Sequence, residues 1–436
     1  MGNNSAAEGA AKSGTGAVSD GYRKKSSNYE AGGSPGKEYR EPFKWGPFLR
    51  ALLIIALPVA FQNLLTTTGS MVDTIMLASL GEKTVGAVGL CAQFTSLMFS
   101  GYWGFIGGGM LFMSQYWGAG DGDGIRHSFG IMMTFLGAVA VIFTVVATVF
   151  PGQAMALYTN NHEIQRLGVP YLSLVGFAYP FQILCVGMSA LLRSIEKVRI
   201  PLYGGIAAVV TNCVCNYILI FGKLGFPAMG TRGAAVGTIL SSIVNLAVLL
   251  FAAVKFHLPY LLDIREHFRF PKKLLKNFLG KSFPIICNEV AMGVANMMIN
   301  VVLGRQSAEA IAAVAVFRVL EGVVISFFSG FSNAASVLVG KEVGAGNHEA
   351  AFARAKRIIY LASGFTAIVC GILIAVHGPL LHVMSLKGES YRIGTSLLMI
   401  YGVIAVIRMG NWCTNDTYRA AGDPAYFARK ARNEDH

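Results

Sequence analysis

Six charged side chains lie inside long apolar stretches of this 436-residue sequence: Asp73, Glu289, Arg318, Glu321, Arg408 and Asp416. Each costs about 2.5–3.5 kcal/mol near the centre of a membrane helix on insertion scales, so each is expected to face protein or water rather than lipid. A carboxylate in such a place can take up a proton or a sodium ion, and either event removes the charge that would hold a cationic molecule. Asp73 and Glu289 are therefore candidates for cation exchange. The alternative for each is a structural hydrogen bond to neighbouring helices.

Polar residues in other apolar stretches predict partners for these charges. Asn212 and Asn216 are four residues apart and share one face of a helix. Thr238, after Gly233-Ala234-Ala235, is positioned to add a hydroxyl to the same cavity. The alternative is amide hydrogen bonding between helices, which is common in membranes. Arg318 and Glu321 are spaced for a local ion pair, and Arg408 is available to an acid that the sequence does not identify.

These residues must be positioned by membrane helices. Hydrophobic residues make up 54% of the chain and charged residues only 14%, against roughly 25% charged in typical soluble domains. Continuous apolar stretches of about 20 residues predict ten spanning helices, and the lack of alternation disfavours an outer-membrane barrel. The stretches are 49–79, 84–113, 128–150, 168–192, 202–222, 233–254, 282–304, 310–338, 358–376 and 393–418. The predicted fold class is an all-α polytopic membrane protein.

An internal repeat organises these stretches. Residues 58–194 recur at 284–420 with a constant offset of 226, which pairs Pro58 with Pro284 and Arg193 with Arg419. Two homologous halves are a common plan of secondary transporters and imply a cleft between them. Six predicted helices separate the repeats, an even number, so the two halves enter the membrane in the same direction. Asp73 and Glu289 fall at non-equivalent places in the repeat.

Lys and Arg concentrate in the loops that are cytoplasmic when residue 1 is inside, which predicts a cytoplasmic N-terminus. This asymmetry accounts for much of the net charge of +13, and no nucleic-acid recognition module accompanies it. Neither the cysteines nor the histidines show metal-ligand spacing, so we expect no resident metal and no cofactor. A catalytic nucleophile with its base is also not visible, which disfavours an enzyme. No secretory signal peptide precedes the first apolar stretch.

Five segments are expected along the chain. They are a disordered cytoplasmic tail (1–48), an N-terminal six-helix lobe (49–256), a cytoplasmic linker (257–277), a C-terminal lobe with four helices (278–424) and a charged tail (425–436).

Several short motifs, taken in order, resemble those of the multidrug and toxic compound extrusion (MATE) family over about 49–424. In the first half they include Pro58-x-x-x-Gln62, Val72-Asp73-Thr74-Ile75-Met76, Gly118-Ala119-Gly120-Asp121 and Asn212-x-x-x-Asn216-Tyr217. In the second half they include Gly344-Ala345-Gly346-Asn347 and Arg419-Ala420-Ala421-Gly422-Asp423. No single motif is specific, but their order and repetition together are.

The resemblance implies two parallel, inverted-V lobes on a six-plus-six plan that export small organic cations in exchange for Na⁺ or H⁺. It implies a monomer that spans the plasma or inner membrane and needs no cofactor beyond the coupling ion. It also implies that Asp73, Asn212, Asn216 and Thr238 form the coupling site of the first lobe and hold Na⁺ transiently. Glu289 is implied as the acid of the second lobe. Gln62 and Asn288 are implied in the substrate cavity.

The sequence departs from the family pattern at three places. Well-studied members can carry an acid where this chain has Asn216, and others place the acid of the seventh helix about one turn later, where this chain has Met292. After Asp423 the family pattern continues into two more helices that this sequence lacks, so we expect the chain as given to transport poorly or not at all. A flippase of the same superfamily, moving lipid-linked sugars, is the other alternative, and cationic residues lining the cleft would favour it.

Overall fold

A computed structural model describes residues 45–262, 267, 269–303, 307–383 and 388–422. The chain divides after Pro47, and of its first unit only the helical residues 45–47 are described. Most of the predicted tail and all of 425–436 therefore lie outside the described residues. Every regular element among the described residues is helical, so the chain is an all-α polytopic membrane protein.

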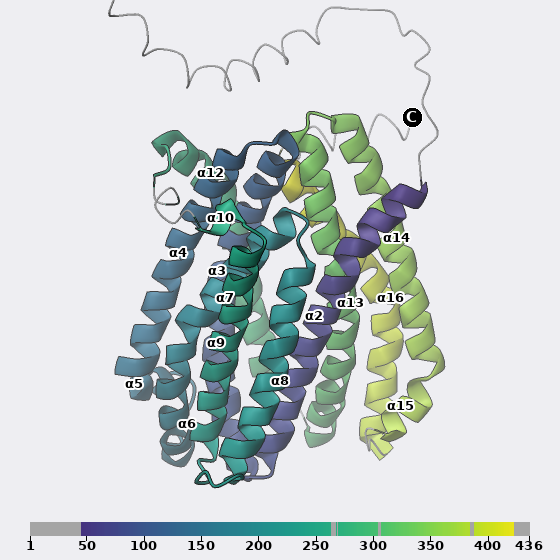
Figure 1. Cartoon of the computed structure of the whole chain (residues 1–436). Helices are drawn as coiled ribbons and strands as arrows, with labels where there is room; N and C mark the ends of the chain where they lie inside the picture. Colours follow the sequence, from purple (N-terminus) through teal and green to yellow (C-terminus); the bar gives the residue numbers. More distant parts are fainter. Residues whose placement is uncertain (1–44, 263–266, 268, 304–306, 384–387, 423–436) are drawn as a thin grey trace, which may run out of the picture. The chain divides into compact units, whose positions relative to one another are not determined.

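Among the described residues of the first half, nine helices follow one another along the chain (Figure 1). They are α2 (Trp45–Ala78), α3 (Glu82–Ala119), α4 (Gly122–Val149), α5 (Pro151–Ala156), α6 (His162–Val175), the 3₁₀ helix η1 (Gly176–Ala178), α7 (Tyr179–Ser194), α8 (Arg199–Phe221) and α9 (Thr231–Lys255). The short α10 (Pro259–Leu262) follows within the predicted linker. The second half contains α12 (Lys272–Leu303), α13 (Ala308–Gly344), α14 (His348–Ala375), α15 (His377–Val383) and α16 (Gly388–Ala421).

Within the described residues, nine segments are long and apolar enough to cross a membrane. They account for nine of the ten predicted spans, with α6, η1 and α7 together forming one of them. The tenth, 282–304, falls on α12, whose last turns include side chains outside the described part of the chain.

The helix boundaries follow the sequence repeat. Three helices of the first half, α3, α4 and α5, begin 226 residues before α13, α14 and α15. The motif Gly118-Ala119-Gly120-Asp121 forms the first of these boundaries, because Gly120 ends α3 with φ 72° and Asp121 caps α4. The carboxylate of Asp121 accepts a hydrogen bond from the Gly124 backbone N–H at 2.9 Å, which satisfies a donor left free at the helix start.

The two halves differ at one proline. In the first half the helix is interrupted by η1, whereas its counterpart in the second half is the continuous α16. Pro180 has no N–H to donate to the Gly176 carbonyl four residues earlier, whereas the equivalent position in α16 is Val406. The Gly176 carbonyl accepts instead from the Tyr179 backbone N–H at the end of the 3₁₀ turn, and the hydroxyl of Thr144 in α4 donates to it as well at 3.3 Å.

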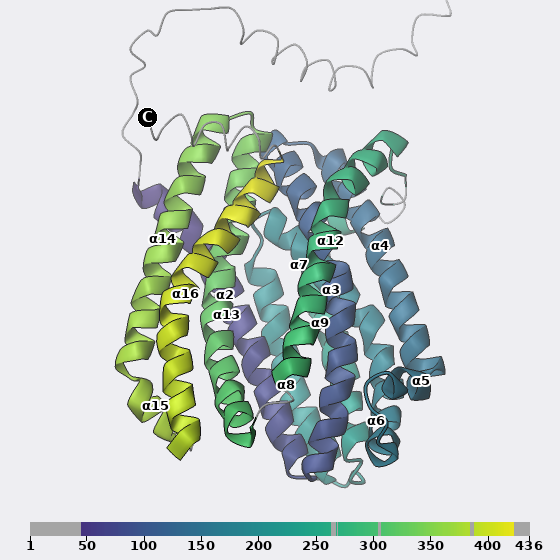
Figure 2. The ribbon, with the colours of Figure 1, turned by 180° about the vertical axis from the view of Figure 1, so that it is seen from behind.

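The first helix of each half packs against the second helix of the other half, as the opposite views in Figures 1 and 2 show. A side chain at Gly104 of α3 would meet Ile286 of α12. A side chain at Gly330, the equivalent position of α13, would meet Ala56 of α2. These matched glycines place the two halves around a pseudo-twofold axis.

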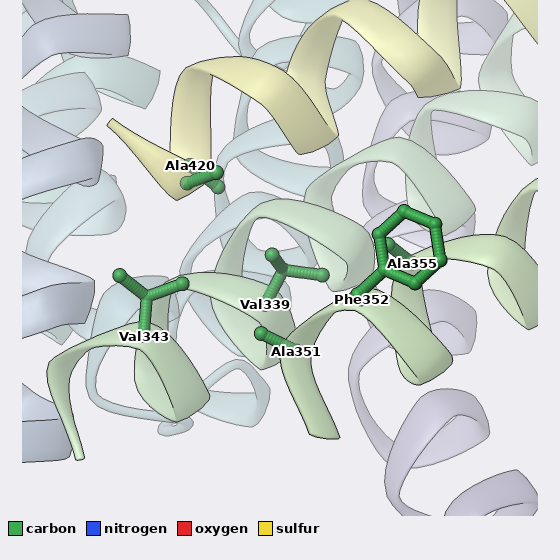
Figure 3. Packing of buried hydrophobic residues seen from close by; sticks show 7 residues of the cluster. Val339, Val343, Ala351, Phe352, Ala355 and Ala420 are labelled. Atoms are coloured by element: carbon green, nitrogen blue, oxygen red, sulfur yellow. The ribbon is translucent and has the colours of Figure 1, made fainter. Parts of the chain in front are cut away.

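A small core closes the second half near the end of α13. Seven buried residues from α13, α14 and α16 pack together there, and Figure 3 shows them as sticks. They are Val339, Val343, Ala351, Phe352, Ala355, Ala420 and Ala421. Most are small, so the three helices approach closely, as is usual for helices packed in membranes.

Candidate functional site

The structure brings the Asp73 carboxylate together with both predicted carboxamides. Asp73 lies on α2, and the Nδ2 atom of Asn216 on α8 donates to its Oδ1 at 2.7 Å. The amide of Asn212, oriented so that a donor faces the acceptors, places its nitrogen 2.7 Å from Oδ1 and 3.0 Å from Oδ2. Asp73 is half-buried and Asn216 is buried. The two amide nitrogens hold the carboxylate in place by donating hydrogen bonds, and its oxygens can take up a proton or a hard cation.

The third helix of this arrangement, α9, contributes a glycine rather than the predicted hydroxyl. The Oδ1 atom of Asn216 is buried without a hydrogen-bond partner in the described structure and lies against Gly237. Thr238 follows that glycine, but its hydroxyl donates to the Ala234 carbonyl of its own helix at 3.0 Å. The structure therefore places Thr238 beside the group without a bond to Asp73.

The two residues expected in a substrate cavity have different surroundings. The Oε1 atom of Gln62 on α2 accepts from Nη2 of Arg193 at 2.8 Å, and Nη1 of the same arginine donates to Asn333 on α13 at 3.4 Å. Arg193 thus joins the two halves. Asn288 on α12 is exposed and makes no side-chain hydrogen bond to the described residues.

Glu289 belongs to a group of charges in the second half. Nη1 of Arg419 on α16 lies 3.3 Å from Oε1 of Glu289 and 3.6 Å from Oδ1 of Asp416. Ser332 on α13 donates to the other oxygen of Asp416. With both acids ionised, this group carries one net negative charge. We call Glu289, Ser332, Asp416 and Arg419 the α16 acid cluster.

The sequence places Asp416 among the charged positions of the apolar stretches but predicts no role for that residue. Ser332 is not predicted to belong to a site. Two signals were available. Asp416 is three residues before Arg419 and so shares its helix face. Arg419 is also the repeat equivalent of Arg193, which contacts α2 as Arg419 contacts α12.

Arg408 forms a separate ion pair with Glu321. Its Nη1 atom on α16 lies 2.5 Å from Oε1 of Glu321 on α13. The side chains are 46% and 19% exposed, respectively, so the guanidinium is the more accessible member of the pair.

The halves touch closely where α3 and α13 end. A side chain at Gly118 would meet the Lys341 carbonyl, and one at the equivalent Gly344 would meet the Gln115 carbonyl. We call these four residues the paired crossing. Beside it, Nζ of Lys341 lies 2.8 Å from Oε1 of Glu196, which comes from the first half.

Comparison with known proteins gives the same family as the sequence motifs. The MatE family model matches residues 58–218 and 284–429, more than half of the chain. The chain is 24% identical over 358 residues to "Probable multidrug resistance protein YoeA" of Bacillus subtilis (strain 168), covering 80% of this chain and 76% of that protein. It is 26% identical over 383 residues to "Probable multidrug resistance protein NorM" of Thermotoga maritima, covering 86% and 80%.

A solved structure supports the fold independently. "Crystal structure of MATE in the bent conformation" superimposes with a TM-score of 0.76 at 18% identity and covers 88% of this chain and 85% of that one. The motif resemblance is therefore confirmed, and this multi-pass membrane chain belongs to the MatE family of transporters.

Proposed function

We propose that this chain is a secondary active antiporter that exports small organic cations in exchange for Na⁺ or H⁺. The observation that carries this proposal is the Asp73 carboxylate, held by Asn212 and Asn216 within a membrane-spanning helix. Family membership and relatives named as multidrug resistance proteins support export of organic compounds. A carboxylate within a membrane span is unfavourable to insert, so its presence there indicates a functional role.

Competition for one negative charge couples the two movements. When a proton or Na⁺ occupies Asp73, the group no longer attracts a cationic molecule, and the molecule is released. The amide groups of Asn212 and Asn216 fix the carboxylate without adding charge, so a single monovalent ion is enough to neutralise it. In the second half, the α16 acid cluster carries one net negative charge and is the proposed second exchange group, with Glu289 as its accessible acid.

Movement of lipid-linked sugars is less well supported. That function requires cationic side chains that line the cleft between the halves and are available there to bind phosphate. Arg193 contacts Gln62 and Asn333, while Arg408 and Arg419 form ion pairs with acids. These arginines are engaged by the protein itself.

Efflux from liposomes tests the proposal. Because the chain as given is expected to transport poorly, the assay uses this chain and a version extended by the two helices with which the family pattern continues. A fluorescent organic cation such as ethidium would be followed under an imposed Na⁺ gradient and, separately, under an imposed pH gradient. We expect one gradient to drive efflux by the extended version and Asp73→Asn to reduce this driven component at least about tenfold, which corresponds to about 1.4 kcal/mol. Asp123→Asn is the matched control, because Asp123 is 76% exposed and pairs with Arg126 of its own helix. Gradient-driven efflux that survives in Asp73→Asn would exclude Asp73 from coupling.

A further inference from the structure

A cavity of about 440 Å³ lies in the first half, and Asp73 is not among the residues that line it. It is formed by the start of α6, the end of the loop between α8 and α9, and the start of α9. Its lining residues are Arg166, Leu167, Pro170, Ala228, Met229, Thr231 and Arg232. The volume is within the range of about 300–1,000 Å³ that is typical of small-molecule sites.

The charge of this cavity is entirely positive. Arg166 and Arg232 are 66 positions apart in sequence but line the same space, and no acidic residue lines it. Neither arginine forms an ion pair or a side-chain hydrogen bond with the described residues. Glu163, one helical turn before Arg166, is instead held by Lys83 at 2.7 and 2.8 Å. Two guanidinium groups are thus available to an external anion.

The cavity lies near the ends of two helices that are long and apolar enough to span a membrane. Arg166 is in the second turn of the span His162–Ser194, and Arg232 is the second residue of the span Thr231–Lys255. In the adjoining loop, Leu224 is 82% exposed and Phe226 is 55% exposed. Exposed apolar and aromatic side chains at the end of a membrane helix are suited to the boundary between lipid and water.

We propose that Arg166 and Arg232 form a binding site for a phosphate group, supplied by an acidic phospholipid of the surrounding membrane. The planar guanidinium presents two parallel N–H donors that match phosphate oxygens, and two such groups match the charge of a headgroup. The hydroxyl of Thr231 adds a neutral donor at the same wall. Basic pockets between membrane helices on the matrix or cytoplasmic side bind acidic headgroups by this chemistry, and Arg166 and Arg232 offer the same donors on the side that the sequence predicts to be opposite. The site shares no lining residue with the proposed coupling site.

The repeat supplies a matched control. The residue equivalent to Arg166 in the second half is Arg392, which already pairs with Glu389 at 2.9 Å. Substituting Arg392 therefore removes the same charge at the same depth without removing the proposed site.

Native mass spectrometry and lipid titration of the full chain in neutral detergent test the proposal. Phosphatidylglycerol, phosphatidylcholine and inorganic phosphate would be added in separate arms. We expect phosphatidylglycerol to bind the wild-type chain and Arg392→Gln equally. Its binding to the double variant Arg166→Gln/Arg232→Gln should be about 10- to 30-fold weaker, because each arginine near the membrane surface contributes about fivefold to the affinity. Each single variant should show part of this loss, and thermal unfolding without lipid should confirm that all variants are folded.

The phosphate arm separates the two sources of the ligand. If inorganic phosphate binds the wild-type chain as tightly as phosphatidylglycerol and fails with the double variant, the phosphate site stands and its ligand is a soluble anion. If the double variant binds phosphatidylglycerol as the wild type does, or if Arg392→Gln loses as much affinity, the proposal is overturned.

Discussion

The paired crossing predicts that a single methyl group at Gly118 or Gly344 separates the two halves. At Gly118 the methyl would fall on the Lys341 carbonyl, and at Gly344 it would fall on the Gln115 carbonyl. Both obstacles are backbone atoms of long helices, so no side-chain rotation can relieve the overlap. The halves must move apart at this end to accept either substitution.

The size of the effect follows from the cost of overpacking. Forcing an additional methyl into a packed contact costs about 1–3 kcal/mol. Alanine also stabilises a helix by about 0.5–1 kcal/mol relative to glycine, but this gain is present in every arrangement of the halves and cancels from their equilibrium. We therefore expect Gly118→Ala or Gly344→Ala to disfavour the closed crossing about 5- to 150-fold. In thermal stability the two terms oppose each other, so the net change should be smaller than the overpacking cost alone.

Spin labels at equivalent positions measure this separation. Asp123→Cys and Glu349→Cys place labels on exposed residues at the starts of α4 and α14, one in each half. The exposed Cys287 and the partly exposed Cys213 and Cys215 are first replaced by serine so that they take no label. Double electron–electron resonance in lipid nanodiscs then reports the distribution of distances. We expect a longer distance to become dominant in the alanine variants.

Two glycines in open surroundings serve as controls. Gly137 and Gly364 are helical, and a side chain at either would meet nothing within 4 Å. Gly137→Ala and Gly364→Ala should leave the distance distribution unchanged. If Gly118→Ala and Gly344→Ala also leave it unchanged, the crossing does not hold the halves together and the reasoning is refuted.

Three further predictions concern named contacts. Lys341→Glu should lengthen the distance between the same two labels, because the ion pair between Lys341 and Glu196 becomes a repulsive pair of acids. Adding Glu196→Lys should restore the wild-type distance. If the distance is not restored, charge is not the cause of the change. The pair is partly exposed, so its own contribution is only about 0.2–1 kcal/mol. Asp416→Ala should lower the free energy of unfolding by about 1–3 kcal/mol in a thermal assay, because its serine and arginine partners lose a buried acceptor; an unchanged midpoint would contradict this. Thr144→Val should cost about 0.5–1.5 kcal/mol in the same assay by removing one of the two donors to the Gly176 carbonyl, and a stabilised variant would argue against that bond.

Local spacing made part of the site predictable. Asn212 and Asn216 share a face because they are four residues apart, and that face meets Asp73. Thr238 was predicted to join them, but a threonine hydroxyl within a helix can bond to the carbonyl four residues earlier, and Thr238 does so. Spacing along the chain identifies which residues share a helix face. It does not decide whether a hydroxyl on that face donates its hydrogen bond to its own helix or to a distant residue.

Contacts between helices far apart in sequence were harder to predict. The repeat predicted two similar halves, but hydrophobicity does not specify which helix packs against which, since lipid is as apolar as leucine. The packing of α2 on α13 and of α12 on α3 depends instead on small residues. Gly104 and Gly330, which mark these contacts, are repeat equivalents in the printed sequence.

The two repeat-related arginines show how the halves differ. Arg193 meets the neutral amides of Gln62 and Asn333, so its surroundings keep a positive charge. Arg419 meets the acids Glu289 and Asp416, so its surroundings carry a net negative charge. The paired crossing, in contrast, is made of backbone contacts that are the same in both directions. The repeat therefore keeps the backbone contacts between the halves, while the charges diverge around an unchanged arginine. Close approach of two helices restricts the residue type at the glycines on both sides of the contact, whereas a polar group beside an arginine can be an amide or an acid without a change of fold.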